Sequence, residues 1–133
     1  MMELIISSCN KQVKTVSSKI LEVLNGKGVD ETFLFDLRLA CEEALINAVK
    51  HGNKSDPQKT VTVRYEIIPE GVTISIIDQG EGFDYESVPD PRTVKNLLRA
   101  GGRGLFLIRK LMDKVEFNDS GNQITMTKLF PKK

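Results

Sequence analysis

The hydrophobic positions of this chain follow two periods, one typical of strands and one typical of helices. Short runs rich in β-branched residues predict strands at residues 3–8, 60–67, 72–77, 114–118 and 123–130. Apolar residues at helical spacing predict helices at residues 13–24, 33–51 and 105–112. This order of elements implies an α+β fold, a two-layer α/β sandwich in which helices cover one face of a largely antiparallel sheet.

Turn and capping residues mark the ends of these elements. Gly26 and Gly28 stop the first helix, and Asp30 is placed to cap the start of the second. Gly52 ends the second helix, and the tripeptide Pro69-Glu70-Gly71 joins two strands as a hairpin. The second helix has one apolar stripe, which we expect to pack in the core and which consists of Leu34, Leu37, Cys41, Ala44, Leu45 and Ala48.

Residues 81–102 follow neither period. The segment is polar and contains Pro89, Pro91 and Gly101, which predicts a loop with at most one short helix, around residues 94–99. Loops of this length in small domains commonly carry function. We therefore expect this segment to contribute to the activity of the chain.

Composition places the chain among ordinary soluble proteins. Its 133 residues are enough for one domain, residues 1–133, and 40% of them are apolar and 28% charged. The net charge of +1 gives no sign of a basic surface that would bind nucleic acid. No apolar run approaches the roughly 18 residues of a membrane span. The N-terminus lacks a signal-peptide pattern, so we expect a cytoplasmic protein. Cys9 and Cys41 are too few for a disulfide framework, and no cysteine or histidine spacing suits zinc.

Glu43 and Asn47 stand four residues apart on the second predicted helix, at the border of its apolar stripe. A carboxylate in this place is half-desolvated by the core, which suits a general base that accepts a proton from a hydroxyl nucleophile. The amide oxygen of Asn47 suits magnesium, which takes one or two protein ligands when phosphates and water supply the rest. Taken alone, the pair also fits a solvated helix face. His51, one turn further, fits a C-terminal cap better than a catalytic role.

The segment Asp78-Gln79-Gly80-Glu81-Gly82 follows the predicted strand at 72–77, so the carboxylate of Asp78 emerges at the end of the sheet. A carboxylate accepts a hydrogen bond from the exocyclic amine of adenine, whereas guanine presents a carbonyl there, so Asp78 favours ATP over GTP. Gly80 and Gly82 let the backbone approach the base and sugar closely. No dinucleotide fingerprint and no P-loop is present. Taken alone, the motif also fits an ordinary turn.

Gly102 and Gly104 precede an apolar helix whose first amides have no partner within the helix, and such a terminus binds phosphate. Lys95, Arg99 and Arg103 recur every four residues and would line one side of this segment if it were helical. In that place they neutralise the charge of a transferring phosphoryl group. A solvated basic face is the alternative for Lys95 and Arg99, whereas Arg103 is held between two glycines.

The order and spacing of these three motifs resemble the Bergerat-fold ATPases, the superfamily of gyrase, chaperone, histidine kinase and MutL ATPases. Residues 43–47 match the N-box, residues 78–82 the first glycine box and residues 102–104 the second. The segments 51–53 and 102–108 resemble, more narrowly, the small anti-sigma factor serine kinases of bacteria. Many relatives have a Gly-Thr pair at the start of the last strand, where this chain has Gly121 and Asn122, so a third box stays unassigned.

The resemblance implies a regulatory serine/threonine kinase that binds ATP and Mg²⁺. Such a kinase phosphorylates a serine on a STAS-domain anti-anti-sigma protein, sequesters an RNA polymerase sigma factor and is often a homodimer. Glu43 then resembles the catalytic base, Asn47 the magnesium ligand and Asp78 the residue that reads adenine. The nucleotide-loop glycines are Gly80, Gly82, Gly102 and Gly104. The loop at 81–102 is expected to be a lid that the γ-phosphate orders.

Two other interpretations use the same residues. One is a nucleotide-gated binding module without productive phosphotransfer, in which Glu43 is an incidental helix residue. The other is the ATP-binding domain of a histidine kinase separated from its partner domain. The sequence offers no phosphoacceptor helix for that second interpretation.

Overall fold

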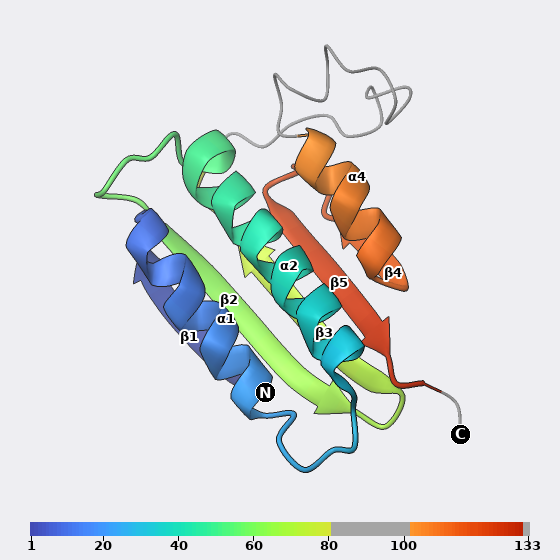
Figure 1. The fold of residues 1–133 in the computed structure, drawn as a ribbon. Helices are drawn as coiled ribbons and strands as arrows, with labels where there is room; N and C mark the ends of the chain where they lie inside the picture. Colours follow the sequence, from blue (N-terminus) through green and yellow to red (C-terminus); the bar gives the residue numbers. More distant parts are fainter. Residues whose placement is uncertain (81–101, 132–133) are drawn as a thin grey trace.

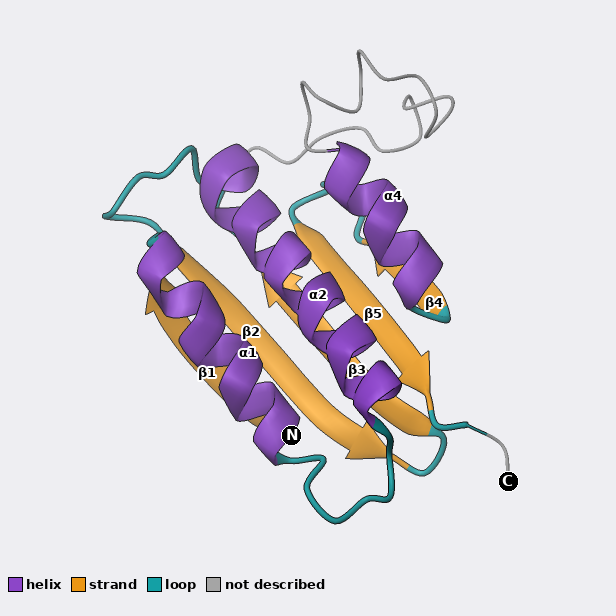
Figure 2. Cartoon of the chain, viewed as in Figure 1, coloured by secondary structure: helices purple, strands orange, loops and turns teal. Residues whose placement is uncertain are grey.

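Five antiparallel strands form one sheet with the order β1-β2-β3-β5-β4 in the computed structural model, which describes residues 1–80 and 102–131. The strands are β1 (Met2–Ser7), β2 (Thr60–Ile68), β3 (Gly71–Ile77), β4 (Lys114–Phe117) and β5 (Gln123–Leu129). The helices are α1 (Val13–Glu22), which follows the short 3-10 helix η1 (Asn10–Gln12), α2 (Glu31–Asn47) and α4 (Gly102–Leu111). All three lie on one face of the sheet, with α2 between α1 and α4 (Figures 1 and 2). The predicted α+β two-layer fold is confirmed.

The strands alternate between a buried and an open face, as their sequence pattern requires. In β3, Val72, Ile74 and Ile76 are buried beneath the helices. On the other face, Ser75 of β3 and Thr125 of β5 form a hydroxyl-to-hydroxyl hydrogen bond of 3.0 Å. The core between the two layers includes the fully buried side chains Ile20, Leu37, Leu45, Ile74, Ile108 and Met126.

The ends of the first two helices follow the predicted capping residues. Gly26 and Gly28 have φ angles of +80° and +76°, a conformation that favours glycine and ends the α1 region. The side chain of Asp30 accepts a hydrogen bond of 2.9 Å from the backbone N–H of Phe33, which caps α2. Cys41 of α2 is 1% exposed and lies in the core, where burial raises the pKa of its thiol to about 12. Its predicted place in the core is therefore confirmed.

The sequence predicts one continuous helix that extends through His51, and the structure differs from this prediction at the end of α2. The α-helix ends at Asn47, and residues Ala48–Gly52 form a wider π-helical turn, η2. The backbone N–H of Asn53 donates to the carbonyl of Ala48 at 2.9 Å, a span of five residues. The turn widens because the side chain of Asn53, which follows it, is hydrogen-bonded at the ends of three strands. His51 is exposed within this turn.

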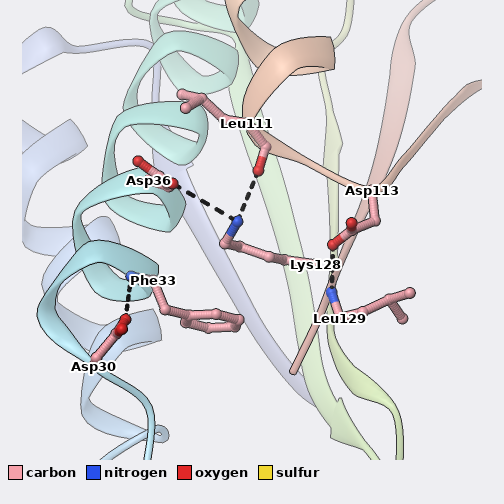
Figure 3. Close-up of polar contacts among 7 residues, drawn as sticks. All are labelled: Asp30, Phe33, Asp36, Leu111, Asp113, Lys128 and Leu129. Carbon is pink, nitrogen blue, oxygen red and sulfur yellow. Dashed lines mark hydrogen bonds and ion pairs between the residues drawn. The ribbon is translucent and has the colours of Figure 1, made fainter. Parts of the chain in front are cut away.

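The C-terminal end of α4 is fastened to β5 and α2 by Lys128 (Figure 3). The Lys128 ammonium donates a hydrogen bond of 2.8 Å to the carbonyl of Leu111, the last residue of α4. It lies 4.0 Å from the Asp36 carboxylate of α2 and 5.2 Å from the centre of the Phe33 ring. One side chain thus contacts both helices that border the candidate site.

Candidate functional site

A cleft lies between α2, α4 and the adjacent ends of β3 and β5. It encloses about 420 Å³, including the part open to solvent. Its walls are mainly apolar and include Ala44, Ile76, Leu105, Ile108 and Ile124. The polar side chains that line it are those of Asn47, Asp78, Asn122 and Gln123. The cleft therefore brings together residues of the first two predicted motifs.

Asp78 is held in place at the end of β3. Its backbone N–H donates to the carbonyl of Asn122 at 2.9 Å, and its Oδ1 accepts a hydrogen bond of 2.8 Å from the N–H of Gly80. Within residues 1–80 and 102–131, no hydrogen bond is made to the other oxygen, Oδ2. Burial raises the pKa of Asp78, and the Gly80 hydrogen bond and the charge of Lys59 oppose this shift.

Gly104 brings the third predicted motif against the first. A Cβ atom on Gly104 would lie 2.8 Å from Oε2 of Glu43 and 3.1 Å from Nδ2 of Asn47. Contacts of this length require the Glu43 carboxylate to shift and the Asn47 amide to give slightly, so a larger residue at position 104 would displace these side chains. Glu43 and Asn47 are both half-buried, at the predicted border of the apolar stripe.

Gly52 and Gly80 form a second close contact, at the Asp78 end of the cleft. A Cβ atom on Gly52 would overlap the carboxylate of Asp78, and one on Gly80 would overlap the carbonyl oxygen of Gly52. The packing of the chain on itself therefore requires glycine at position 80. This requirement is separate from the close approach to base and sugar that the sequence predicts for Gly80.

The remaining predicted site residues are only partly covered by the structure. Gly82, Lys95 and Arg99 lie outside the described residues, as does the predicted lid apart from Gly102. Gly102 begins α4, and Arg103 follows it in the same helix, but its side chain also lies outside the described part. Their expected roles toward phosphate remain predictions.

Three residues near the cleft were missed as contributors to the site. Gly121, with a φ angle of +75°, and Asn122 line the cleft from the β4–β5 turn, for which the sequence assigns no third glycine box. The Nδ2 of Asn122 donates to the carbonyl of Asp78 at 3.3 Å, and its Oδ1 accepts from Nδ2 of Asn118 at 2.6 Å. Asn53, fully buried, was treated only as part of a helix end and a family motif. A turn-forming Gly-Asn pair was the available signal for the first two.

Comparison with known proteins agrees with this architecture. A family model described as the histidine kinase-like ATPase domain matches residues 6–128. The serine-protein kinases RsbW of Staphylococcus aureus strains MSSA476 and MW2 are each 33% identical over 138 residues, covering 98% of this chain and 87% of the relative.

A solved structure supports the fold. The crystal structure of the RsbU and RsbW domains of Rv1364c from Mycobacterium tuberculosis matches with a TM-score of 0.57 and 19% identity. The match covers 99% of this chain and 34% of that longer chain. None of the helices in the described residues is long and apolar enough to cross a membrane. With the family match over most of its length, this chain belongs to the histidine kinase-like ATPases, and its relatives include serine-protein kinases.

Proposed function

We propose that this chain is an ATP-dependent serine-protein kinase that phosphorylates a STAS-domain anti-anti-sigma protein and sequesters a sigma factor. The observation that carries the proposal is the contact of Gly104 with Glu43 and Asn47, at the border of a cleft that also contains Asp78. Kinase activity is supported by the relatives named serine-protein kinase. The two protein partners, and a homodimeric state, are proposed from the resemblance to anti-sigma kinases.

The cleft fits an adenine base at its Asp78 end. Ile76, Ile108 and Ile124 provide apolar walls, and the half-buried Asp78 provides an acceptor. Its Oδ1 already accepts from Gly80, so Oδ2 is the oxygen that would accept from the exocyclic amine of adenine. Guanine has a carbonyl at that position, which would face a carboxylate without a proton between them.

Asn47 fits the role of a magnesium ligand. Among the described residues, no group of three histidine, cysteine, aspartate or glutamate side chains is arranged to hold a metal. A site with one amide oxygen suits Mg²⁺, because phosphate oxygens and water complete its six ligands. When bound, ATP would supply the phosphoryl group and Mg²⁺ would neutralise part of its charge. Asn122 is less suited, because its Oδ1 already accepts from Asn118.

Glu43 is the proposed general base. It lies one helical turn before Asn47 and faces Gly104, where the missing Cβ leaves its carboxylate undisturbed. The carboxylate accepts the proton of the substrate serine as the serine oxygen bonds to the γ-phosphorus, and ADP leaves. Arg103, Lys95 and Arg99 are proposed to face the phosphates, with Gly82 and Gly102 in the nucleotide loops.

A phosphotransfer assay with candidate STAS-domain proteins tests this proposal. Glu43→Ala should retain Mg-ATP binding and lose roughly 10²- to 10⁴-fold in transfer rate, because it removes the base but no nucleotide ligand. Glu42→Ala, which removes the neighbouring carboxylate, should transfer at the wild-type rate. Asn47→Ala should instead weaken Mg²⁺-dependent nucleotide binding.

Two results would contradict parts of the proposal. Wild-type transfer by Glu43→Ala would remove Glu43 as the base. ATP binding by the wild type without transfer to any cognate STAS candidate would favour a nucleotide-gated binding module.

A further inference from the structure

Asn53 is a fully buried amide at the point where α2 and three strands meet. Its Oδ1 accepts a hydrogen bond of 2.7 Å from the backbone N–H of Gln79, two residues after the end of β3. Its Nδ2 donates to the carbonyl of Thr60 at 2.9 Å, at the start of β2. The same Nδ2 donates to the Ser8 hydroxyl at 2.7 Å, just beyond β1. The side chain is 0% exposed, so these partners replace water completely.

The partners of Asn53 determine which residue type fits. Gln79 offers a backbone N–H and Thr60 a backbone carbonyl, so the site needs an acceptor on one side and a donor on the other. A carboxylate would have no donor for Thr60, and leucine would leave both backbone groups unpaired in a buried place. The asparagine amide, with one acceptor and two donated hydrogens, satisfies all three partners.

The backbone around Asn53 connects these strand ends to the helix that carries Asn47. The N–H of Asn53 donates to the carbonyl of Ala48 at 2.9 Å, one residue after Asn47. Gly52 packs directly against the Asp78 carboxylate and Gly80. Residues 52 and 53 therefore connect the Asn47 side of the cleft with its Asp78 side.

We propose that Asn53 is a positioning residue that holds Asn47 and Asp78 at the spacing required to bind the metal-phosphate and adenine parts of one nucleotide together. This inference rests on the proposed function, and it adds a role for a residue that does not line the cleft. Its consequence is that ligands that use both ends of the cleft depend on Asn53, and ligands that use the Asp78 end alone do not.

Loss of the Asn53 amide should leave Asp78 in place. The N–H of Asp78 remains bonded to the carbonyl of Asn122, which keeps it in register with β5. The side chain of Gln79 also accepts from the N–H of Thr60 at 2.7 Å, which joins β3 to β2 without involving the helix. The connection that is lost is the one between the end of α2 and the end of β3.

The test compares two ligands on the full chain and its Asn53→Ser variant. Affinity for Mg-ATP, which spans the cleft, should fall between about 5- and 100-fold in the variant. Affinity for adenosine, which uses the Asp78 end alone, should change by less than about threefold. A purely structural role would lower the folded fraction and so reduce the apparent affinities for both ligands equally.

Two further variants separate positioning from stability. Asp30→Ala removes the cap at the opposite end of α2 and serves as the control, so it should affect the binding of Mg-ATP and adenosine equally. Ser8→Ala removes one acceptor of the Asn53 amide and leaves Gln79 and Thr60 untouched. If Asn53→Ser does not fold, Ser8→Ala should still weaken Mg-ATP more than adenosine, by about two- to fivefold.

Hydrogen exchange in the nucleotide-free protein tests the contact itself. The amide of Gln79 should exchange faster in Asn53→Ser than in the wild type, and the amide of Asp78 should keep its protection. Unchanged Gln79 exchange, or equal losses for both ligands, would overturn the inference. Failure of the wild type to bind Mg-ATP would overturn the proposed function and this inference together.

Discussion

Asp78 serves the proposed nucleotide site at the expense of the stability of the nucleotide-free protein. Burial raises its pKa in the folded state, so folding favours the protonated carboxyl. The favourable contribution is complete below the pKa of the unfolded chain, ordinarily about 3.9, and is lost as the pH rises through the higher folded pKa. At neutral pH, the ionised Asp78 therefore lowers the free energy of unfolding.

Asp78→Asn should consequently separate stability from binding. The variant keeps an oxygen for the Gly80 N–H but has no charge to bury, so its melting temperature without nucleotide should exceed that of the wild type at pH 7. This difference should shrink as the pH is lowered toward 4. The free energy of ATP binding should become less favourable by about 1–3 kcal/mol, because a donor replaces part of the acceptor that faces the adenine amine.

Calorimetry of both proteins across this pH range, with ATP and GTP titrations at pH 7, checks these outcomes. Equal melting temperatures at every pH would show that burial of the charge is unimportant. Equal affinities of the wild type for ATP and GTP would remove Asp78 from adenine recognition.

Gly104→Ala should reduce activity although it favours the helix. Alanine is favoured over glycine inside a helix by about 1 kcal/mol. Its Cβ would nevertheless approach Glu43 to 2.8 Å and Asn47 to 3.1 Å, which displaces the proposed base or the proposed metal ligand. We expect a transfer rate lower by roughly 10- to 100-fold, measured with saturating nucleotide. Arg109→Ala, an exposed change on α4, is the control, and an active Gly104→Ala would rule out the importance of this contact.

Among single residues, local pattern predicted Asp30 as a cap and Cys41 as a core residue, because both roles depend on neighbours in the same helix. Asn53 could not be predicted in this way. Its partners, Ser8, Thr60 and Gln79, lie at or just beyond the ends of three strands, and the local periodicity of the sequence does not indicate that they meet.

At the scale of elements, both hairpins and all three described helices were predicted from periodicity. The β2–β3 and β4–β5 pairs are joined by short turns, so their pairing follows from local sequence. The π-helical turn after Asn47 was not predicted, because the α-helical pattern continues through His51 and only tertiary anchoring at Asn53 widens it. The sequence predicts the three motifs separately, and the contact between Gly104 and Glu43 depends on the packing of α4 on α2.

The contact of Lys128 with the end of α4 should contribute to the stability of the fold. Its side chain is 13% exposed and donates to the last carbonyl of the helix, so Lys128→Met retains the aliphatic stem but leaves the carbonyl of Leu111 without this donor. The free energy of unfolding should fall by about 1–2 kcal/mol in denaturant titrations.

Lys114→Met is the matched control. Its ammonium lies 3.4 Å from Glu116, and both side chains are mostly exposed, so the change should be within about 0.5 kcal/mol. Equal effects of the two substitutions would contradict the importance of the contact between Lys128 and α4.

For the whole molecule, the sheet combines pairings of strands that are close in the sequence with pairings of strands that are far apart in it. β2 and β3 form one hairpin, and β4 and β5 form another. The central pairing of β3 with β5 joins Ile77 to Gln123 across the intervening segment and α4. The candidate cleft lies at this central seam, because Asp78 follows β3 and Asn122 precedes β5.

This arrangement has a consequence for the kinetics of folding. Hairpins close quickly, whereas a pairing between distant segments must first overcome a larger loss of chain entropy. We expect the seam between β3 and β5 to form late, so the site exists only after the folding barrier has been crossed. Mg-ATP should then slow unfolding and leave the refolding rate almost unchanged, which stopped-flow measurements at several nucleotide concentrations would detect. Faster refolding with nucleotide would place the seam in the folding nucleus instead. If this seam forms late, bound nucleotide would keep the folded sheet intact, and the rate of nucleotide release would limit how soon the chain can unfold.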